Sequence, residues 1–513
     1  MSSKQASLIF FFVAAIYFVL WAIVPFLLEP NFRFDTIEMF IVGKEGVLAT
    51  YKHPALNSII LEIVYQGFNR NEIAPFFLNQ IFFLLTALAI WRIGREFFTP
   101  FESLVGVLMF YGYWSFFYSS LNYNHNVPAI AAWSYVMLFA LLAIKYDRYR
   151  DWIGLGIAIG LGFHFKVIMF FVVMSILIFT IINSSTRKFW LRGGVYLTIF
   201  ISFIIASPII YWVVVSEFSF LKFPLADQID KTLINWFFIL FDILITVPLL
   251  LLSYYVLFLP LSKTKFKLTF KEKSELDSNQ VLAGNFLFGV SFIAWLLTSI
   301  SCLVFFVDRD LHDFSHIFIF TGLIFIAFFK TTQSSKAVRL FFIFFTITMA
   351  CYVIGYCTHI YVAYNFRKEV WYLFPGKELA AEVEKIWYKK YDKPLRYITG
   401  KWTLAGNVAI YSKDRPTCHC DYENFPLTTW STDQDVAHAG GIAIWKTNDT
   451  NVSLPDWIIK RFPEAEYAET IKLQPLTLRN KKPYYAGVAI IPPNDSIKPQ
   501  KITPAPIRLW TIK

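Results

Sequence analysis

Residues 6–28, ASLIFFFVAAIYFVLWAIVPFLL, are followed almost at once by residues 31–40, NFRFDTIEMF. The first stretch has no charged residue and is long enough to cross a bilayer as a helix. Lys4 precedes it and no small-residue cleavage site follows it, so we expect an anchoring span and not a removable signal. The second stretch places two acids, Asp35 and Glu38, just beyond this span.

Composition extends the argument from the first span to the whole chain. Hydrophobic residues make up 56% of the 513 residues, and Phe alone occurs 56 times. Charged residues make up 16%, compared with about 25% in soluble proteins. These values exclude a soluble cytosolic enzyme, a disordered chain and a disulfide scaffold. They predict a polytopic α-helical membrane protein, because a helix satisfies its own backbone hydrogen bonds in lipid.

Ten further apolar runs qualify as spans, although the two that meet between His164 and Lys166 are short. A cytoplasmic N-terminus puts most loop Lys and Arg residues on the cytoplasmic side, as the positive-inside rule requires. An odd number of spans then puts the C-terminal region outside. These basic loops explain the net charge of +11, so nucleic acid is not expected as a partner. The eleven predicted spans are residues 6–28, 74–91, 101–118, 127–144, 152–165, 167–183, 194–215, 234–258, 281–306, 314–330 and 338–362.

Two parts of the chain lie outside these spans, a long first outer loop at residues 29–73 and a C-terminal region. We therefore predict a membrane domain at residues 1–364, which includes that loop, and an outer α/β domain at residues 365–513. In the second domain, the apolar spacing of residues 376–392 predicts a helix. Short β-rich runs between Gly, Asp and Pro turns predict strands at residues 395–399, 408–411, 442–445 and 485–491.

The acids of the first outer loop are the first candidates for chemistry. The chain has no P-loop, no strand-linked GxGxxG and no HExxH, so direct use of a nucleotide is not expected. Asp35 and Glu38 share one face if their segment is helical. A carboxylate there could accept a proton or orient a nucleophile, although an ordinary solvated loop acid would look the same.

Cations and amides near membrane depth form the second group of candidates. Lys52 and His53 precede Pro54, and an interfacial Lys suits a phosphate headgroup, although snorkelling of its side chain toward lipid headgroups explains it equally well. Residues 122–126, NYNHN, contain more amides than a turn needs and could hydrogen-bond a sugar. Lys166 lies between two apolar runs, which suggests an anionic ligand.

Two further clusters have simpler explanations. The outer loop that includes Arg309 and His316 also contains several Asp residues, so it could be a self-neutralising surface. Cys418, His419 and Cys420 could form a metal cluster with His438, but their spacing is not a standard zinc pattern, so we predict no metal site. The outer loops as a whole suit an anionic lipid headgroup that carries a sugar.

The order of these features resembles the GT-C glycosyltransferases, in particular the bacterial family 39-like branch related to protein O-mannosyltransferases and lipid A aminoarabinose transferases. The resemblance is carried by an acid soon after the first span, by the Lys-His-Pro motif, and by many spans followed by an outer domain. The most specific part comprises residues 374–387, FPGKELAAEVEKIW, residues 394–400, PLRYITG, and residues 402–416, WTLAGNVAIYSKDRP.

The resemblance implies an undecaprenyl-phosphate-linked sugar as donor, transfer at the periplasmic face with inversion, and no cofactor or metal. Asp35 matches the family's catalytic acid, and Glu38 is a candidate second acid without a clear match. Asn126 stands where many members have a second acid, and Ala55 replaces the second Pro of a His-Pro-Pro motif. The residues expected at the carrier phosphate are Lys52, His53, Lys166 and Arg309. Those expected to orient sugar or acceptor are Asn124, His125, Asn126 and His316.

The expected function is therefore transfer of a sugar to an envelope acceptor, with lipid A first among the candidates, in the bacterial inner membrane. A protein hydroxyl as acceptor is the alternative within the same enzyme class. A non-enzymatic transporter or flippase of lipid-linked sugars is the third hypothesis, although we find none of the inverted repeats common in transporters. The sugar, the acceptor, the oligomeric state and the role of Cys418 and Cys420 stay open.

Overall fold

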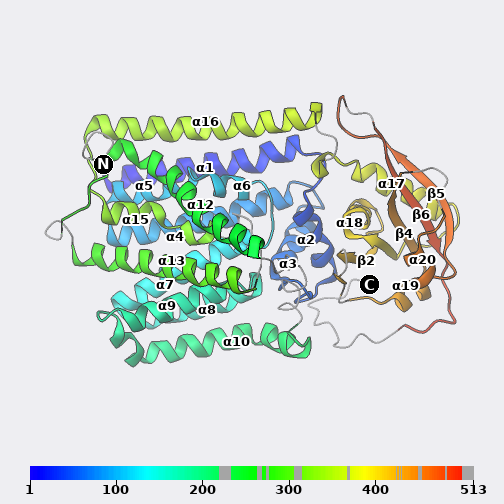
Figure 1. Cartoon of the computed structure of the whole chain (residues 1–513), viewed down its shortest axis with the longest axis horizontal. Helices are drawn as coiled ribbons and strands as arrows, with labels where there is room; N and C mark the ends of the chain where they lie inside the picture. The colour runs from blue at the N-terminus through cyan, green and yellow to red at the C-terminus, as the bar shows by residue number, and fades with distance from the viewer. Residues whose placement is uncertain are drawn as a thin grey trace. The chain divides into compact units, whose positions relative to one another are not determined.

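The computed structural model describes most of the chain (Figure 1). The described residues are 1–218, 233–262, 268–272, 277–305, 315–366, 370–422, 425–426, 428, 430–448, 453–479 and 482–499. They form two compact units. The first, here called the membrane unit, comprises Met1–Ile23, Phe76–Ile210 and Pro224–Gly355. The second, here called the outer unit, comprises Val24–Pro75, Tyr211–Phe223 and Tyr356–Lys513. The domain boundary expected at residues 364 and 365 stays a prediction.

Six described helices are long and apolar enough to cross a membrane, so the chain is a multi-pass membrane protein. These are α1 (Ser3–Leu28), α4 (Ala74–Phe97), α7 (Asn126–Tyr146), α10 (Gly193–Val215), α13 (Ser278–Phe305) and α16 (Ser335–Phe366). The other helices of the membrane unit are α5 (Pro100–Tyr111), α6 (Trp114–Ser119), α8 (Tyr149–Phe165), α9 (Met169–Ile182), α12 (Leu233–Phe258) and α15 (Thr321–Phe328), with short 3-10 helices η1 (Arg187–Leu191), η2 (Leu259–Leu261) and η4 (Ser315–Phe318). The total of eleven spans and their orientation stay predictions.

Two predicted spans are interrupted. The continuous helix expected at residues 101–118 is wrong, because α5 ends at Tyr111 and α6 begins at Trp114. The carbonyl of Gly112, at this break, accepts a 2.6 Å hydrogen bond from the Tyr352 hydroxyl. The run at residues 314–330 is likewise divided into η4 and the eight-residue α15. Apolar composition alone did not reveal these breaks.

Close helix packing in the membrane unit depends on two glycines of α8. A Cβ atom on Gly156 would lie 2.9 Å from the Cβ of Ile201, and one on Gly160 would lie 2.6 Å from the Cβ of Ile205. Small residues four apart let helix backbones approach closely where lipid supplies no hydrophobic drive for association. Thr198 of α10 adds a 2.9 Å hydrogen bond to the carbonyl of Trp152. These contacts fix α8 against α10.

A six-stranded sheet forms the C-terminal part of the outer unit, with strand order β3-β2-β1-β4-β6-β5. Strand β1 pairs in parallel with β2 and β4, whereas β4, β6 and β5 pair antiparallel. The strands are β1 (Tyr397–Lys401), β2 (Thr417–Tyr422), β3 (Phe425–Pro426), β4 (Gly441–Thr447), β5 (Glu466–Leu473) and β6 (Tyr484–Ile491). The helices of this part are η5 (Trp371–Leu373), α17 (Gly376–Tyr388), α18 (Trp402–Tyr411), α19 (Asp433–Ala439) and α20 (Asp456–Arg461).

Most of the local predictions for this region are confirmed. Helix α17 buries Leu379, Val383 and Trp387, as their spacing indicated, and β1, β4 and β6 overlap the predicted strands. The strand expected at residues 408–411 is wrong, because these residues end α18. Every residue from Trp402 to Ile410 is buried, so the segment shows no amphipathic period that would have identified a helix.

The first outer loop folds into two helices, α2 (Phe34–Glu45) and α3 (Leu56–Gly67), which belong to the outer unit. Residues Thr36–Lys44 of α2 are all buried. A Cβ on Gly406 of α18 would lie 2.6 Å from the side chains of Ile37 and Ile41, which shows how closely α18 contacts α2. The loop is therefore a packed part of the outer unit and not a solvated connection.

The contact between α2 and α3 depends on Gly43, where a Cβ would lie 2.2 Å from the carbonyl oxygen of Ser58. We expect Gly43→Ala to lower stability by about 1–3 kcal/mol, because a backbone atom must move to admit the methyl group. Thermal unfolding of the purified protein measures this change. Gly67→Ala is the control, since nothing lies within 4 Å of a Cβ there. Equal losses in both variants would contradict the packing argument.

Candidate functional site

Asp35 lies in the first turn of α2 and is half-buried. Helix α2 confirms that Asp35 and Glu38 occupy helical positions three apart, and Glu38 is buried. Arg33, which immediately precedes α2, fixes the start of this helix. Its guanidinium donates hydrogen bonds to the buried Glu29 carboxylate, and this carboxylate also accepts a 2.9 Å hydrogen bond from the Tyr356 hydroxyl. The candidate acid is thus carried by an immobilised helix end.

A tight turn between α2 and α3 positions Lys52 and His53. The Thr50 hydroxyl oxygen accepts hydrogen bonds from the backbone amides of Lys52 (3.2 Å) and His53 (3.0 Å). The Thr50 amide in turn donates to the His53 carbonyl at 2.9 Å. This turn directs Lys52 back to α2, where its Nζ lies 2.8 Å from Oε2 of Glu38. One residue expected near the carrier phosphate, Lys52, is therefore paired with a candidate acid.

Burial raises the pKa of the Glu38 carboxyl above its usual value. The charge and hydrogen bond of Lys52 oppose this rise, whereas the negative charge of Asp35 adds to it. Glu38 is therefore a carboxylate that depends on Lys52 to stay ionised. The Glu38–Lys52 pair stabilises the helix that carries Asp35, and both residues remain candidates for the reaction.

The membrane unit contains a second group of candidates. The Lys166 Nζ donates to Oδ1 of Asn126, so the structure brings together two residues that lie forty positions apart. Lys166 is buried and ends α8 in an extended conformation. The Asn124 side chain accepts a 2.9 Å hydrogen bond from the Asn126 amide, which fixes the start of α7. His125 is buried beside it.

Two candidates come from the region that follows α13, His316 and Arg309. His316, in η4, is buried, and its ring centroid lies 4.9 Å from that of Trp133. Arg309 lies outside the described residues. Of the predicted site, the structure therefore assembles Asp35, Glu38 and Lys52 in the outer unit, and separately Asn126 and Lys166 in the membrane unit.

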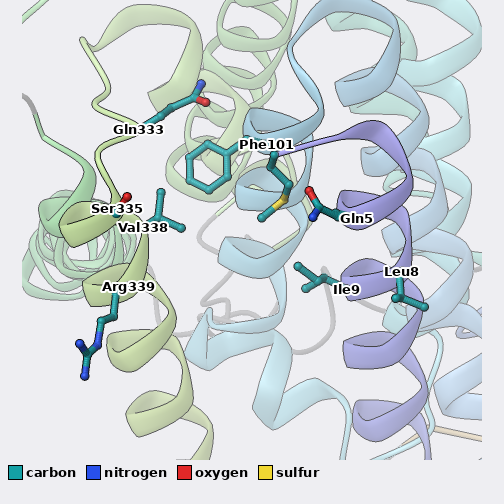
Figure 2. A pocket seen from close by; sticks show the side chains of 9 residues that line it. Gln5, Leu8, Ile9, Phe101, Gln333, Ser335, Val338 and Arg339 are labelled. Carbon is teal, nitrogen blue, oxygen red and sulfur yellow. The ribbon is translucent and has the colours of Figure 1, made fainter.

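A cavity of about 510 Å³ opens at the N-terminal end of α1 (Figure 2). Its lining comes from α1, α5 and the start of α16. The lining residues are Met1, Gln5, Leu8, Ile9, Phe101, Gln333, Ser335, Val338 and Arg339. No candidate residue is among them.

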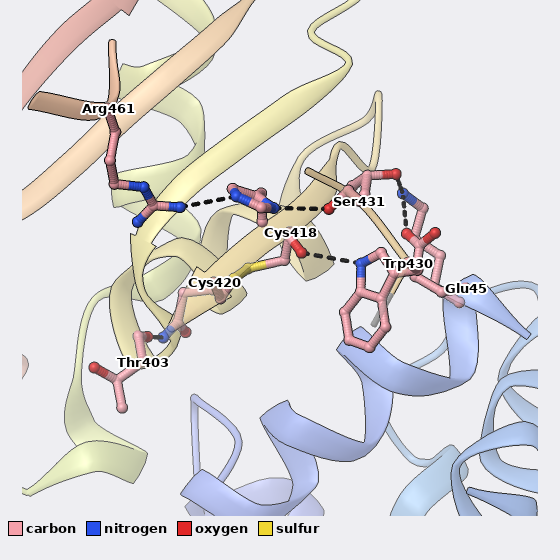
Figure 3. The surroundings of a disulfide bond; sticks show 11 residues. Glu45, Thr403, Cys418, Cys420, Trp430, Ser431 and Arg461 are labelled. Carbon is pink, nitrogen blue, oxygen red and sulfur yellow. Dashed lines mark hydrogen bonds and ion pairs between the residues drawn. A yellow bond between two sulfur atoms is a disulfide. The ribbon is translucent and has the colours of Figure 1, made fainter. Parts of the chain in front are cut away.

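The cysteine cluster on β2 is a disulfide and not a metal site (Figure 3). Cys418 pairs with Cys420, so neither offers a thiolate. Between them, His419 contacts the Ser431 hydroxyl and an Asp433 carboxylate oxygen, each at 2.8 Å. Burial would raise the pKa of Asp433, but hydrogen bonds from His419 and Arg461 lower it to about 2. Within the described residues, no group of three or more His, Cys, Asp or Glu could bind a metal ion.

Sequence reasoning missed a buried ion pair of the outer unit. Arg415 Nη1 lies 2.6 Å from Oε1 of Glu62, and its Nη2 lies 3.0 Å from Oε2. Burial opposes ionisation of Glu62, yet the hydrogen bonds and charge of Arg415 leave the pKa of this carboxyl below its usual value. An acid within the apolar α3 segment was the available signal. Nothing in the local pattern identified a partner 353 residues away.

None of the curated proteins compared with the chain gives a significant match. A family model does: residues 52–212 match the dolichyl-phosphate-mannose-protein mannosyltransferases. Over these residues the chain is similar to that family. The match begins at Lys52 and includes Asn126 and Lys166, although it covers less than half of the chain.

A solved structure shares the fold. The arabinofuranosyltransferase AftD from mycobacteria, with 10% identity and a TM-score of 0.52, matches 96% of this chain, which in turn covers 40% of AftD. ArnT from Cupriavidus metallidurans, solved bound to undecaprenyl phosphate, has 10% identity and a TM-score of 0.49 over 97% of this chain and 100% of ArnT. The resemblance to GT-C enzymes stated from the sequence is thus confirmed at the level of fold and family model.

The dependence of Glu38 on Lys52 gives a testable effect of pH. When folding raises the pKa of a carboxyl, the folded protein loses stability as the pH rises above about 4.3, the pKa of Glu in the unfolded chain. Lys52→Met removes the charge that limits this rise, so we expect the variant to lose thermal stability progressively toward neutral pH relative to wild type. Adding Glu38→Gln to Lys52→Met should make the difference in thermal stability from wild type nearly independent of pH, because the titrating carboxyl is then absent.

The control for this experiment is Lys385→Met. Lys385, like Lys52, forms an ion pair with a glutamate, here Glu382, but the Lys385 side chain is exposed. Unfolding midpoints of the variants are measured from pH 4 to 8, a range that brackets the unfolded pKa of about 4.3 for Glu. A constant offset between Lys52→Met and wild type at every pH would contradict the prediction.

Proposed function

We propose that the chain is an inverting glycosyltransferase that transfers a sugar from a polyprenyl-phosphate carrier to an envelope acceptor. The observation that supports this most is the Asp35–Glu38–Lys52 arrangement on α2 and its adjacent turn, just ahead of and within the segment that matches the mannosyltransferase family. The description of that family names a dolichyl-phosphate sugar, a polyprenyl-phosphate donor. Transfer takes place at the outer face of a bacterial inner membrane, with the N-terminus in the cytoplasm.

In this mechanism Asp35 acts on the acceptor. Its carboxylate takes the proton from a hydroxyl acceptor, or orients an acceptor that is already ionised. The acceptor oxygen then forms a bond to the anomeric carbon as the bond to the carrier phosphate breaks, in a single displacement with inversion. Glu38 is buried and paired with Lys52, so it positions that lysine and leaves the base role to Asp35.

Cations stabilise the leaving group. Negative charge grows on the polyprenyl phosphate as it departs. The residues proposed to stabilise this charge are Lys52, His53, Lys166 and Arg309. One well-placed donor of this kind stabilises the transition state by about 3–4 kcal/mol. Asn124, His125, Asn126 and His316 are proposed to orient the sugar or the acceptor, with Asn126 and Lys166 acting as one hydrogen-bonded unit.

Lipid A is the proposed acceptor, because the sequence motifs of the outer region resemble the branch that modifies it. A protein hydroxyl is the second candidate, and the name of the matched family, a protein mannosyltransferase family, favours it. Both acceptors need the same base and the same leaving-group cations. Only a chemical analysis of the products separates them.

Mass spectrometry of lipid A from cells with and without the gene tests the proposal, alongside strains that carry Asp35→Asn or Asp392→Asn. We expect the deletion and Asp35→Asn to lose one sugar mass, because loss of a general base costs about 10²–10⁴-fold in rate. Asp392 is exposed and serves as the matched acid-to-amide control.

The outcomes separate the hypotheses. Unchanged lipid A in the deletion strain would direct the search to glycoproteins and other envelope glycans. Wild-type modification in a stably inserted Asp35→Asn protein would exclude Asp35 as the base. The same result, together with loss of the sugar in the deletion strain, would also favour a transporter of the lipid-linked sugar over a transferase that uses Asp35.

A further inference from the structure

The two helices of the first outer loop are connected to the sheet region by a buried ion pair. Glu62 of α3 and Arg415, which precedes β2, form two parallel N–H···O bonds of 2.6 and 3.0 Å. Their side chains are only 3% and 6% exposed. Gln66 donates a further 2.6 Å hydrogen bond to Glu62, and the Arg415 guanidinium lies 5.4 Å from the ring centroid of Tyr65.

The backbone of Arg415 supports a specific role for this contact. Its φ angle is +46°, in the left-handed region that a side chain rarely adopts. Such conformations persist where surrounding contacts over-determine them, and they cluster at functional positions. Here the unusual backbone directs the guanidinium to Glu62.

A short series of contacts leads from this pair to the candidate acid. A Cβ on Gly43 of α2 would lie 3.2 Å from the Cβ of Glu62, so Glu62 lies next to the close contact that α2 and α3 make at Ser58. Lys52 precedes α3 and bonds Glu38 of α2. A displacement of α3 would therefore change the spacing between Lys52 and the acid-bearing face of α2.

We infer that Glu62 and Arg415 are a positioning pair through which the sheet region fixes the Asp35 helix and the Lys52 turn in their productive arrangement. This inference rests on the proposed function where turnover is concerned. Misplacement of a reacting group by about 1 Å can cost on the order of a hundredfold in rate. The sheet region thus contributes to catalysis through α2 and α3 without contacting the reacting atoms.

The test compares Arg415→Met, Glu62→Gln and the double variant with Lys377→Met. Lys377 and Glu72 also connect the sheet region to the outer loop at 2.7 Å, but the Lys377 side chain is 57% exposed, and surface pairs contribute little. Acceptor modification per inserted protein reports turnover, and binding of undecaprenyl phosphate to the purified protein reports carrier affinity.

We expect each single variant to lose about tenfold or more in turnover, because a buried charge is left without its partner. Binding of undecaprenyl phosphate should change by less than about threefold, since positioning is a demand of the reaction more than of ground-state binding. The double variant should recover part of the turnover, and Lys377→Met should match wild type. Wild-type turnover in Arg415→Met, equal losses in Arg415→Met and Lys377→Met, or no recovery in the double variant would overturn the inference.

Two further measurements keep the test decisive. If Arg415→Met does not accumulate, Arg415→Lys replaces it, because it keeps the charge but loses the paired hydrogen bonds. If Asp35→Asn retains turnover, the proposed function of Asp35 fails, and hydrogen exchange of residues 34–45 in the full-length protein tests positioning by itself. Faster exchange in Arg415→Met than in Lys377→Met supports the pair, and equal exchange excludes it.

Discussion

Bilayer hydrocarbon offers no hydrogen-bond partner to a peptide group, and this constraint governs the rest of the structure. The long apolar helices of the membrane unit satisfy their backbone internally, and exceptions such as the Gly112 carbonyl receive a side-chain partner. Polar side chains at this depth are correspondingly costly. Lys166 and Asn126, which are hydrogen-bonded to each other, therefore stand out as residues that ordinary packing does not explain.

Tertiary contacts are equally necessary in the part of the chain outside the spans. A carboxylate near a membrane surface is a useful base only if its position is fixed, and short helices are marginally stable alone. Helices α2 and α3 have twelve residues each, and their stability comes from packing against each other and against α18. The outer unit thus supplies apolar contacts and the Glu62–Arg415 pair to a segment that could not hold Asp35 by itself.

Local patterns in the sequence were sufficient where one residue period decides the structure. The spacing of Leu379, Val383 and Trp387 predicted α17, and the break at Lys166 separated α8 from α9. Patterns failed where tertiary contacts decide. Residues 408–411 have the composition of a strand but lie in a helix buried on every side, and the interruption at Gly112 has no distinctive local signal.

The candidate site divides in the same way. The acids and the Lys-His-Pro motif could be identified because each occupies a recognisable place in the first outer loop. The pairing of Lys52 with Glu38 could not, because it depends on how the Thr50 turn directs the chain. Arg415 has no local signal of its role, because that role depends on a partner 353 residues away.

The structure also gives a physical reason for an apparent departure from the GT-C pattern. The resemblance implies that Asn126 occupies the position of a second acid, and its amide oxygen accepts a hydrogen bond from Lys166. A carboxylate in this position would place a negative charge beside the ammonium. An amide orients the lysine and contributes no counter-charge of its own. Under the proposed function, an amide at residue 126 would leave the positive charge of Lys166 available to an anionic leaving group, and Asp35 would serve as the base.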